Sequence, residues 1–441
     1  MHFDEALQYL LSLGHETLAI KLGLRNTELL LDVLGNPQKS YFSVQIAGTN
    51  GKGSTAVVLE SICRAAGIKT GIYTSPHLIS ITERVKINGR DIRRNRFAEN
   101  ASRVRDAAEK LLAEGKIDAL PTFFEQVTAI ALLAFKEACA QLAIFETGLG
   151  GRLDATTTAR AGLIGITPIA LDHQEYLGDS LAAIAAEKAA IVRPGATVIV
   201  APQEPEALEV ILQKAESSKV VPSVDECRTT VENASSDGKL RVTFRTKLNT
   251  YQDVELGLRG RHQITNVSVA IRLAESLQLR GFFIDQRAII RGIENARHAG
   301  RLELWHGKPS FLFDGAHNPA GATALRKYLD EFVQGPITLL FGAMRDKNLT
   351  EMAEILFPAA TSVVLTRPDN PRAAEAEILL GETAGILPPE RVHTTSSVAK
   401  GIQLAKKLTP SDGTICICGS LYLVGETQAM MNRGTSGTHP N

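Results

Sequence analysis

Apolar runs of strand length alternate with longer helical patterns along most of the chain, and this alternation begins near residue 42. The predicted strands of the N-terminal part are Phe42–Ala47, Leu142–Glu146, Leu163–Thr167 and Thr197–Ala201. The predicted helices are Gly51–Ala66, Thr122–Ala140 and Leu181–Val192. A chain that alternates between strands and helices in this way builds a parallel sheet with helices on both faces.

The pattern changes in the C-terminal part. Between Leu240 and Leu258, alternation of apolar and polar residues predicts a small antiparallel insertion. The remaining elements are two predicted helices, Arg261–Leu279 and Asp285–Ala296, and a fresh set of strands, Pro309–Asp314, Ile337–Gly342, Val363–Thr366 and Thr414–Cys418. We therefore predict two α/β domains, residues 1–297 and 298–430, and a disordered polar tail over residues 431–441.

The overall composition is that of an ordinary globular protein. The chain has 441 residues, of which 44% are hydrophobic and 22% charged, and a chain of this length is expected to form two or three domains. Lys+Arg and Asp+Glu both number 48, so no excess positive charge is present for general binding of nucleic acid. We expect the local basic run Arg90, Arg93, Arg94 and Arg96 to form a solvated loop.

Neither a secretory signal nor a membrane span is expected. The opening MHFDEALQYL carries acids where a signal peptide carries basic residues, and the longest uncharged apolar run, Val127–Phe135, is too short to cross a bilayer. The five cysteines show no zinc or redox spacing, and Cys416 and Cys418 alternate with isoleucine on one face of a predicted strand. We interpret all five as packed thiols in a reducing cytoplasm, the expected location of the protein.

The stretch IAGTNGKGST connects a predicted strand to a predicted helix and suits a phosphate-binding loop. Glycines let the backbone approach phosphate oxygens, the first amides of the helix point at the negative charge, and Lys52 reaches the terminal phosphates. The spacing differs from the standard pattern, because Gly48 lies only three residues before Gly51. A further glycine, Gly53, separates Lys52 from Ser54. A glycine-rich turn with an exposed lysine explains the spacing equally well.

The predicted strand 142–146 ends at Glu146 and runs into the segment ETGLGGRLDAT. Leu153 stands where a dinucleotide-binding fingerprint requires glycine, so this loop does not fit that motif. A glutamate at the carboxyl end of a strand, on the same side as a phosphate loop, is a candidate magnesium ligand. The alternative is a turn whose acid caps a helix.

His173 and Lys188 follow the next predicted strand. His173, in LDHQEYLG, is a candidate metal ligand or base, and the alternative is a hydrogen-bonded loop residue. Lys188 lies among apolar residues in IAAEKAAIV, where burial lowers the pKa of an amine. A neutral lysine can take up carbon dioxide to become a carbamate, whereas a helix lysine paired with an acid is the ordinary alternative.

The second predicted domain contributes Arg301 and the segment FDGAHNP. Asn318 and Pro319 are typical of a helix start, since asparagine caps the first turn and proline fits within it. That role does not explain Asp314 and His317. Titratable residues at the carboxyl end of a strand indicate a functional site.

These segments together resemble the folylpolyglutamate synthase/dihydrofolate synthase family, within the Mur-ligase superfamily of ATP-dependent amide-forming enzymes. The matching segments follow the family's order over nearly the whole chain: GTNGKGS, TSPHL, TERVKING, PTFFEQVTA, ETGLGGRLDAT, LDHQEYLG, IAAEKAAIV, GRHQITNVSVA, GRLE, DGAHNP, FGAMRDKN and GSLYLVGE. The resemblance implies a central P-loop ATPase domain with a parallel sheet, a smaller Rossmann-like C-terminal α/β domain, and an active site between them.

The resemblance also implies roles for individual residues, carried over position by position. The residues expected to bind ATP are Gly51, Lys52, Gly53, Ser54, Asn266, Arg301 and Asp314. Those expected to bind two Mg²⁺ ions are Ser75 and Glu146 for the first, and His173 and a carbamylated Lys188 for the second. The expected catalytic groups are Lys52, Lys188, Arg301 and His317. The expected pterin-binding residues are Thr122, Phe123, Phe124, Glu125, Leu153, Asp154 and Ala155.

The implied reaction is ATP- and Mg-dependent addition of L-glutamate to 7,8-dihydropteroate and to tetrahydrofolate γ-carboxylates through an acyl phosphate. The resemblance favours a monomer, and the balanced charge and short apolar runs predict neither a nucleic-acid nor a membrane partner. A folylpolyglutamate synthase without the first activity is the alternative, and a Mur ligase for cell-wall precursors fits TSPHL and PTFFE less well. An inactive regulatory relative need not keep Lys52, Glu146, His173, Lys188 and Asp314. A P-loop kinase or GTPase has a different loop spacing, and a dehydrogenase needs a dinucleotide fingerprint.

Overall fold

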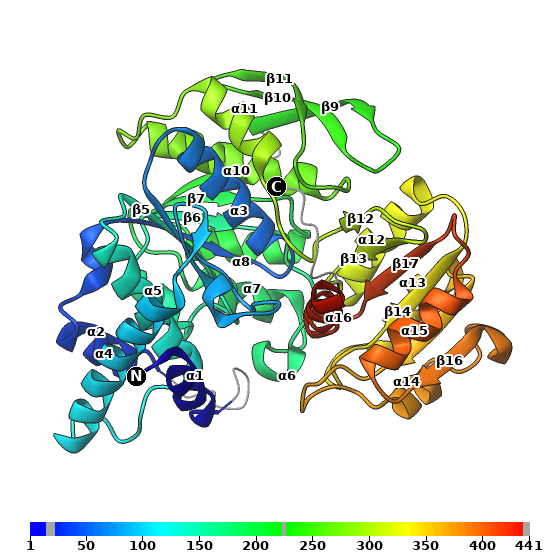
Figure 1. The fold of residues 1–441 in the computed structure, drawn as a ribbon. Coiled ribbons are helices and arrows are strands. Elements are labelled where there is room, and N and C mark those ends of the chain that lie inside the picture. The colour runs from blue at the N-terminus through cyan, green and yellow to red at the C-terminus, as the bar shows by residue number, and fades with distance from the viewer. Residues whose placement is uncertain (15–22, 223–225, 435–441) are drawn as a thin grey trace.

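The computed structural model describes residues 1–14, 23–222 and 226–434, and its largest sheet lies in the first half of the chain (Figure 1). The eight strands are β1 Phe42–Ala47, β2 Thr70–Tyr73, β3 Val85–Ile87, β4 Arg90–Asp91, β5 Leu142–Glu146, β6 Leu163–Ile166, β7 Thr197–Val200 and β8 Lys219–Pro222. Their order is β4-β3-β2-β5-β1-β6-β7-β8, and neighbours are parallel except at β2–β3 and β3–β4. The predicted parallel sheet is confirmed, and β1 and β5 have the predicted bounds.

Helices cover both faces of this sheet because its central strands are apolar on both sides. The helices are α1 Phe3–Ser12, α2 Arg25–Val33, α3 Lys52–Ala65, α4 Arg94–Ala113, α5 Phe123–Glu137, α6 Gln174–Leu177, α7 Leu181–Ala189, α8 Pro205–Lys214, α10 Gln263–Gln278 and α11 Gln286–Asn295. In β5, Leu142 and Ile144 pack with α3, α10 and α11. The alternate residues Ala143 and Phe145 pack with α1, α4 and α5.

An antiparallel sheet of three strands lies at the predicted insertion. Its strands are β9 Cys227–Ala234, β10 Leu240–Thr246 and β11 Thr250–Glu255, in the order β11-β10-β9 (Figure 1). The sequence pattern misses β9, because most of its side chains are exposed and show no apolar alternation. Phe244 and Tyr251 join the same core cluster as α10 and α11, so the insertion packs on these helices.

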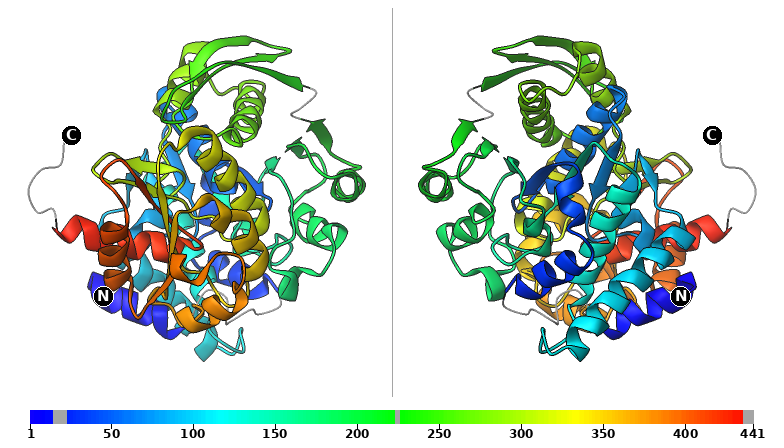
Figure 2. Two further views of the ribbon diagram at one scale, coloured as in Figure 1. Left: turned by 90° about the vertical axis from the view of Figure 1, so that its right-hand side faces the viewer. Right: turned by 90° about the vertical axis from the view of Figure 1, so that its left-hand side faces the viewer.

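The C-terminal part forms its own sheet of six strands (Figure 2). They are β12 Glu303–Trp305, β13 Ser310–Phe313, β14 Ile337–Phe341, β15 Ser362–Thr366, β16 Val392–Thr395 and β17 Thr414–Cys418, in the order β12-β13-β17-β14-β15-β16. The helices are α12 Pro319–Phe332, α13 Leu349–Leu356, α14 Ala376–Glu382, α15 Val398–Leu408 and α16 Leu421–Gly434. Only the β12–β13 pair is antiparallel among these strands. The predicted second α/β unit is confirmed, and its boundary near residue 298 stays a prediction.

Two local predictions are wrong. The basic run does not form a loop, because Arg90 belongs to β4 and Arg94 begins α4, although both side chains are exposed as expected. The helix forms there because Phe97, with later apolar residues at helical spacing, buries one face against the core. Cys139 is exposed just after α5, so it is not a packed thiol, whereas the other four cysteines are buried.

The predicted disordered tail begins too early. Residues 431–434 belong to α16, and residues 435–441 lie outside the described part of the chain. Within the described ranges, no helix combines the length and apolar character needed to cross a membrane.

Candidate active site

The loop between β1 and α3 has the conformation that a phosphate-binding loop needs. Gly48 and Gly51 have φ angles of 141° and 88°, which residues with a side chain rarely adopt. A Cβ atom at Gly51 would also collide with the amide of Asn266, lying 2.9 Å from its Cγ. Lys52 Nζ donates to the Thr49 carbonyl at 2.9 Å, so this lysine folds over the loop instead of extending into solvent.

The loop opens onto a cavity of about 350 Å³, whose walls come mainly from loops that follow strands of both large sheets and from α10 and α12. Every residue that the sequence interpretation assigned to ATP, to metal or to catalysis lines this cavity. These residues are Gly51, Lys52, Gly53, Ser54, Ser75, Glu146, His173, Lys188, Asn266, Arg301, Asp314 and His317. The structure thus brings the whole predicted set together, and their individual roles remain proposals.

Glu146, the last residue of β5, lies against the phosphate loop. Its Oε2 accepts a hydrogen bond from the Ser75 backbone N–H at 3.2 Å, which differs from the alternative of a helix cap. Burial raises the pKa of Glu146, and the positive charge of Lys52 acts in the opposite direction. A buried carboxylate beside a serine offers hard oxygen donors, so this position fits a divalent cation such as Mg²⁺.

His173 and Lys188 have the chemistry of a second metal position. Burial lowers the pKa of His173 to about 3, which keeps its imidazole neutral, and its buried Nδ1 has no hydrogen-bond partner among the described residues. Burial lowers the pKa of Lys188 to about 7, so much of this amine is neutral near pH 7. The adjacent Glu187 pairs with Arg152 at 2.8 Å, and so it does not serve as the partner of Lys188.

Metal binding here requires donors of several kinds. In the part of the chain that the structure describes, no three His, Cys, Asp or Glu side chains are placed to hold a metal ion by themselves. An ion at Glu146 or His173 would therefore also draw on the Ser75 hydroxyl, a carbamate on Lys188, or phosphate oxygens. The residues present fit cation positions of this mixed kind.

Asp314, directly after β13, organises the C-terminal side of the cavity. Its two carboxylate oxygens accept the backbone N–H groups of Leu302 and Ala316, each at 2.9 Å. These bonds fix the segment that contains Arg301 to the turn that contains His317. Burial raises the pKa of Asp314, and the positive charge of Arg301 opposes that shift.

Asp172, which the sequence interpretation missed, connects the two large sheets. Its Oδ1 accepts from Lys347 Nζ at 2.6 Å, and its Oδ2 accepts from Asn318 Nδ2 at 2.9 Å. His317 Nε2 lies 3.6 Å from the same Oδ2. Burial acts to raise the pKa of Asp172, but the hydrogen bond and charge of His317, together with the charge of Lys347, hold it well below its usual range.

Asp172 and Lys347 could have been found from the family resemblance, because both lie in segments that match the family. Asp172 stands directly before His173 in LDHQEYLG, and Lys347 lies in FGAMRDKN. Both segments matched the family, but neither residue has a local pattern that separates it from an ordinary loop residue.

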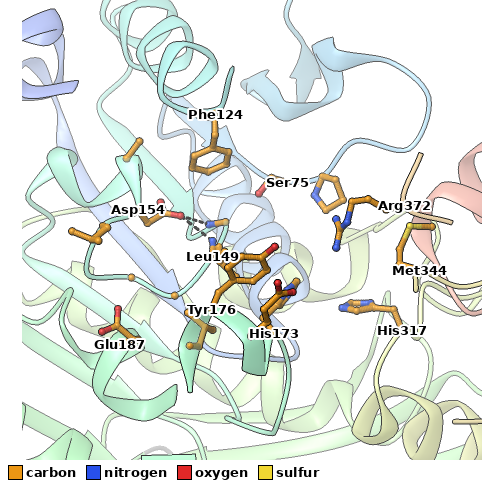
Figure 3. Close-up of a pocket in the computed structure, with 18 of the residues that line it drawn as sticks. Ser75, Phe124, Leu149, Asp154, His173, Tyr176, Glu187, His317, Met344 and Arg372 are labelled. Atoms are coloured by element: carbon orange, nitrogen blue, oxygen red, sulfur yellow. Dashed lines mark hydrogen bonds between the residues drawn. The ribbon is translucent and has the colours of Figure 1, made fainter. Parts of the chain in front are cut away.

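A second and more apolar cavity, of about 460 Å³, adjoins the first (Figure 3). Six of the seven expected pterin-binding residues line it: Thr122, Phe124, Glu125, Leu153, Asp154 and Ala155. Asp154 accepts the backbone N–H groups of Gly148 and Leu149 at 2.9 Å each, so it also shapes the glycine-rich loop. Figure 3 shows Phe124, Asp154 and Tyr176 toward one end of the cavity and His317 and Arg372 toward the other.

Phe123, the seventh expected residue, does not line the cavity. It is 5% exposed and packs in the core with α4 and α5, and the Arg84 guanidinium lies 5.4 Å from the centre of its ring. Consecutive residues of a helix point about 100° apart, so Phe124 faces the cavity while Phe123 faces the core. Tyr176, Lys347 and Arg372 line the cavity without having been predicted.

Comparison with known proteins gives matches along the whole chain. Residues 46–274 match the Mur ligase middle domain, and residues 300–421 match the Mur ligase glutamate ligase domain. The dihydrofolate synthase/folylpolyglutamate synthase of Bacillus subtilis is 33% identical over 418 residues, covering 94% of this chain and 96% of the relative. A probable bifunctional folylpolyglutamate synthase/dihydropteroate synthase of Haloferax volcanii is 34% identical over 98% of this chain, which spans about half, 51%, of that relative.

Solved structures agree over the same extent. Folylpolyglutamate synthase of Mycobacterium tuberculosis complexed with ADP has a TM-score of 0.90 and 30% identity, covering 100% of this chain and 99% of that one. Escherichia coli FolC in complex with DHPP and ADP has a TM-score of 0.87 and 30% identity, covering 99% of both chains. A bifunctional folylpolyglutamate synthase/dihydrofolate synthase with Mn, AMPPNP and L-glutamate bound has a TM-score of 0.84 and 26% identity, covering 98% of both.

Proposed function

The chain belongs to the Mur ligase family and, within it, to the dihydrofolate synthase/folylpolyglutamate synthase group, and from this premise we propose that it is an ATP-dependent ligase that joins L-glutamate to a folate-type carboxylic acid. The junction of the two cavities is the observation on which this proposal rests most. Ser75, Leu149, His173 and His317 are among the residues that line both. A nucleotide on the phosphate loop and an acid in the apolar cavity would therefore meet along one wall, as phosphoryl transfer requires.

The proposed reaction has two steps. A carboxylate is a poor acyl donor, so its oxygen first attacks the γ-phosphorus of ATP, the bond to the β–γ bridging oxygen breaks, and an acyl phosphate and ADP form. The amino nitrogen of L-glutamate then attacks the acyl carbon, phosphate leaves with the electron pair of its bond to carbon, and the nitrogen loses a proton. Lys52 and Arg301 supply positive charge where phosphoryl charge develops, which is the main requirement of phosphoryl transfer.

The site would hold a divalent cation, Mg²⁺ in our proposal, which would supply positive charge to the phosphate oxygens. Ser75 and Glu146 would hold one ion, and His173 with a carbamylated Lys188 would hold a second. Such ions neutralise and orient phosphate oxygens. The complexes of similar proteins with Mn and AMPPNP support a metal-bound nucleotide, while the identity of the ion as Mg²⁺ and the presence of two ions are ours to propose.

The acid substrates we propose are 7,8-dihydropteroate and tetrahydrofolate. The apolar cavity, with the rings of Phe124 and Tyr176 in its wall, suits a flat aromatic group, and similar proteins bind DHPP and L-glutamate. Arg372, which also pairs with Asp346 at 2.7 Å, lines the same cavity from the C-terminal half and would offer its guanidinium to a carboxylate of glutamate. We further propose a monomer that acts in the cytoplasm, where ATP is plentiful.

Glutamate-dependent release of phosphate from ATP and Mg²⁺, measured in parallel with dihydropteroate and with tetrahydrofolate, tests the proposal. Turnover with both acids supports the bifunctional enzyme. Turnover with tetrahydrofolate alone identifies a folylpolyglutamate synthase, the alternative within the family. Protein that binds ADP and turns over neither acid would contradict a folate substrate and favour another Mur-type ligase.

A further inference from the structure

His298 contacts the phosphate loop beside the nucleotide cavity. Its Nδ1 lies 3.2 Å from the Ser54 hydroxyl oxygen. His298 belongs to the segment between α11 and β12, and it is not among the residues that line the cavity, whereas Ser54 is. The Ser54 hydroxyl therefore stands between the imidazole of His298 and the space where phosphate is expected.

Gly53 makes room for this imidazole. A Cβ atom at Gly53 would lie 2.8 Å from His298 Cε1, closer than real Cβ contacts occur. Gly53 lies in the first turn of α3 and has no positive φ angle, so backbone conformation does not require glycine here. The glycine that separates Lys52 from Ser54 is thus explained by the close approach of His298, together with the Glu146 carboxylate, whose Oε2 would lie 3.2 Å from the same Cβ.

A second donor reaches the same hydroxyl oxygen. Gln263 Nε2 donates to Ser54 Oγ at 3.5 Å, and Gln263 Oε1 accepts from Asn266 Nδ2 at 2.8 Å. Burial and the charge of Arg301 lower the pKa of His298 to about 3, so the ring is neutral and has one N–H group. If that group is Nδ1–H, the Ser54 oxygen accepts both of these hydrogen bonds, and its own proton is left for donation to a ligand in the cavity.

The same contact ties the phosphate loop to the segment that contains Arg301. At the far end of this segment, Leu302 N–H donates to Asp314 at 2.9 Å, and Gly315 N–H donates to the Gly300 carbonyl at 2.9 Å. Arg301 therefore sits between two attachments, the His298 contact on one side and the Asp314 contacts on the other.

We propose that His298 is a positioning residue for nucleotide binding. Its Nδ1–H donates to Ser54 Oγ, so that the serine proton points at a phosphate oxygen of the bound nucleotide and Arg301 is kept on the same side. The inference rests on the proposed function only in assuming that this cavity binds ADP and ATP.

Calorimetric titration of the full chain with ADP and Mg²⁺, without any acid substrate, tests this role. The proteins compared are wild type, His298→Leu, His298→Asn, Ser54→Ala and the double variant His298→Leu/Ser54→Ala. Leucine occupies similar space without hydrogen bonding, and asparagine keeps a polar atom at the position of Nδ1. We expect His298→Leu to weaken ADP binding roughly three- to tenfold, the effect of one hydrogen bond, and His298→Asn to restore most of it.

The double variant shows whether His298 acts through Ser54. Once the hydroxyl is gone, His298→Leu should weaken binding by less than about twofold further. Losses that multiply would overturn the inference, as would a folded His298→Leu protein, checked by thermal unfolding, that binds ADP like wild type. If the leucine variant does not fold, the protonation of the two His298 ring nitrogens in the wild-type ADP complex, measured by NMR, tests the donor role instead.

Nitrogen-15 NMR of the ADP complex reads the histidine tautomer directly. Protonated Nδ1 and unprotonated Nε2 are expected for His298, and the opposite tautomer would contradict the donor role. Wild-type protein that fails to bind ADP would defeat the proposed function itself. That outcome is distinct from wild-type binding that His298→Leu leaves unchanged, which defeats only the role of His298.

Discussion

Lys347 Nζ lies 2.6 Å from Asp172 Oδ1, although the two residues belong to different halves of the chain. Both side chains are nearly buried, at 6% and 7% exposure. The same Nζ lies 3.4 Å from His173 Nε2 and 3.7 Å from Asp346. The pair therefore holds the C-terminal sheet against the loop after β6, at the junction of the two cavities.

We expect Asp172→Asn to lower kcat/KM for the ligase reaction roughly 30- to 100-fold. Asparagine preserves the shape but removes the charge, which leaves Lys347 buried with one weaker acidic partner. Removing one partner of a buried, hydrogen-bonded charge pair costs about 2–5 kcal/mol, and we expect the lower end because the cavity admits water. Glutamate-dependent phosphate release measures the effect.

Glu331→Gln provides the matched control for Asp172→Asn. Arg261 and Glu331 also pair between the two halves of the chain, at 2.6 Å, but their side chains are 52% and 35% exposed. An exposed pair contributes about 0–1 kcal/mol, so kcat/KM should change by no more than about threefold. Equal losses in both variants would show a general loosening of the interface and count against a special role of Asp172.

Gly51→Ala should abolish tight nucleotide binding, and Gly67→Ala should not. Both glycines have positive φ angles, 88° and 79°, so either substitution should cost about 1–2 kcal/mol of folding stability. Only at Gly51 would the new Cβ collide with Asn266, since nothing lies within 4 Å of a Cβ at Gly67. Because such a collision costs about 1–3 kcal/mol, we expect ADP affinity to fall about tenfold or more in Gly51→Ala alone. Equal ADP affinities, at equal loss of thermal stability, would contradict the assignment of the phosphate loop.

Lys188→Met should stabilise the protein most at and below neutral pH. The pKa of this amine is about 7 in the folded protein, because of burial, against an ordinary value of 10.5. Between these values the unfolded chain binds more protons than the folded one, so wild-type stability rises with pH and approaches that of the variant. The difference in free energy of unfolding between Lys188→Met and wild type should therefore shrink by up to about 1.4 kcal/mol for each pH unit between about 7 and 10.5.

Urea denaturation of wild type and Lys188→Met at about pH 6 and about pH 10 measures this gap. A gap that does not change with pH would show that Lys188 is not a buried neutral amine. Addition of bicarbonate should stabilise wild type and leave the methionine variant unchanged, because only a lysine forms a carbamate.

The parts of the site that follow from sheet topology were predictable from the sequence. β1 and β5 are apolar runs of clear length, and residues at the carboxyl ends of adjacent parallel strands must meet at one edge. Lys52 and Glu146 therefore converge once the strand order is known. Their chemistry is also local, since the glycines of the loop and the terminal glutamate are visible in the sequence.

The contacts that join the two halves were not predictable in this way. The pairs Asp172–Lys347 and Ser54–His298 arise from how the C-terminal sheet and the segment before it dock on the first sheet. No periodicity in either segment encodes that docking, and Asp172, His298 and Lys347 each look like ordinary loop residues in the sequence. The prediction that Phe123 binds the pterin failed for a similar reason. Phe123 and Phe124 have the same side chain, and the sequence alone does not show which of them points from the helix into the cavity.

Phe124→Ala and Phe123→Ala should have opposite effects on substrate binding and stability. Phe124 lines the apolar cavity, so its loss should raise KM for the pterin acid about tenfold with little change in ADP affinity. Phe123 is 5% exposed, so its loss should cost about 3–5 kcal/mol of folding stability. Michaelis–Menten kinetics measures the change in KM for the pterin acid, and urea denaturation measures the change in folding stability. A stable Phe123→Ala protein with reduced pterin affinity would show that Phe123 belongs to the binding site and would contradict this assignment.

Gly425→Ala should disturb metal-nucleotide binding from a distance. Gly425 of α16 packs against the backbone of Leu78, and a Cβ there would lie 2.7 Å from the Leu78 carbonyl carbon. The Leu78 side chain packs in the cluster formed by β13, β17 and α16, so this segment cannot easily retreat. Ser75 lies three residues before Leu78, so pressure on Leu78 should displace Ser75. This displacement should raise KM for Mg-ATP roughly five- to twentyfold.

Gly381→Ala is the control for Gly425→Ala, because it also replaces a helical glycine with alanine in the C-terminal part of the chain. Nothing lies within 4 Å of a Cβ at Gly381 in α14, so the substitution should stabilise the protein by about 0.5–1 kcal/mol and leave KM for Mg-ATP unchanged. The comparison separates steric pressure on Leu78 from the general effect of alanine in a helix. If Gly425→Ala also leaves KM for Mg-ATP unchanged, then Leu78 can shift without moving Ser75, and the C-terminal sheet does not govern the metal position through α16.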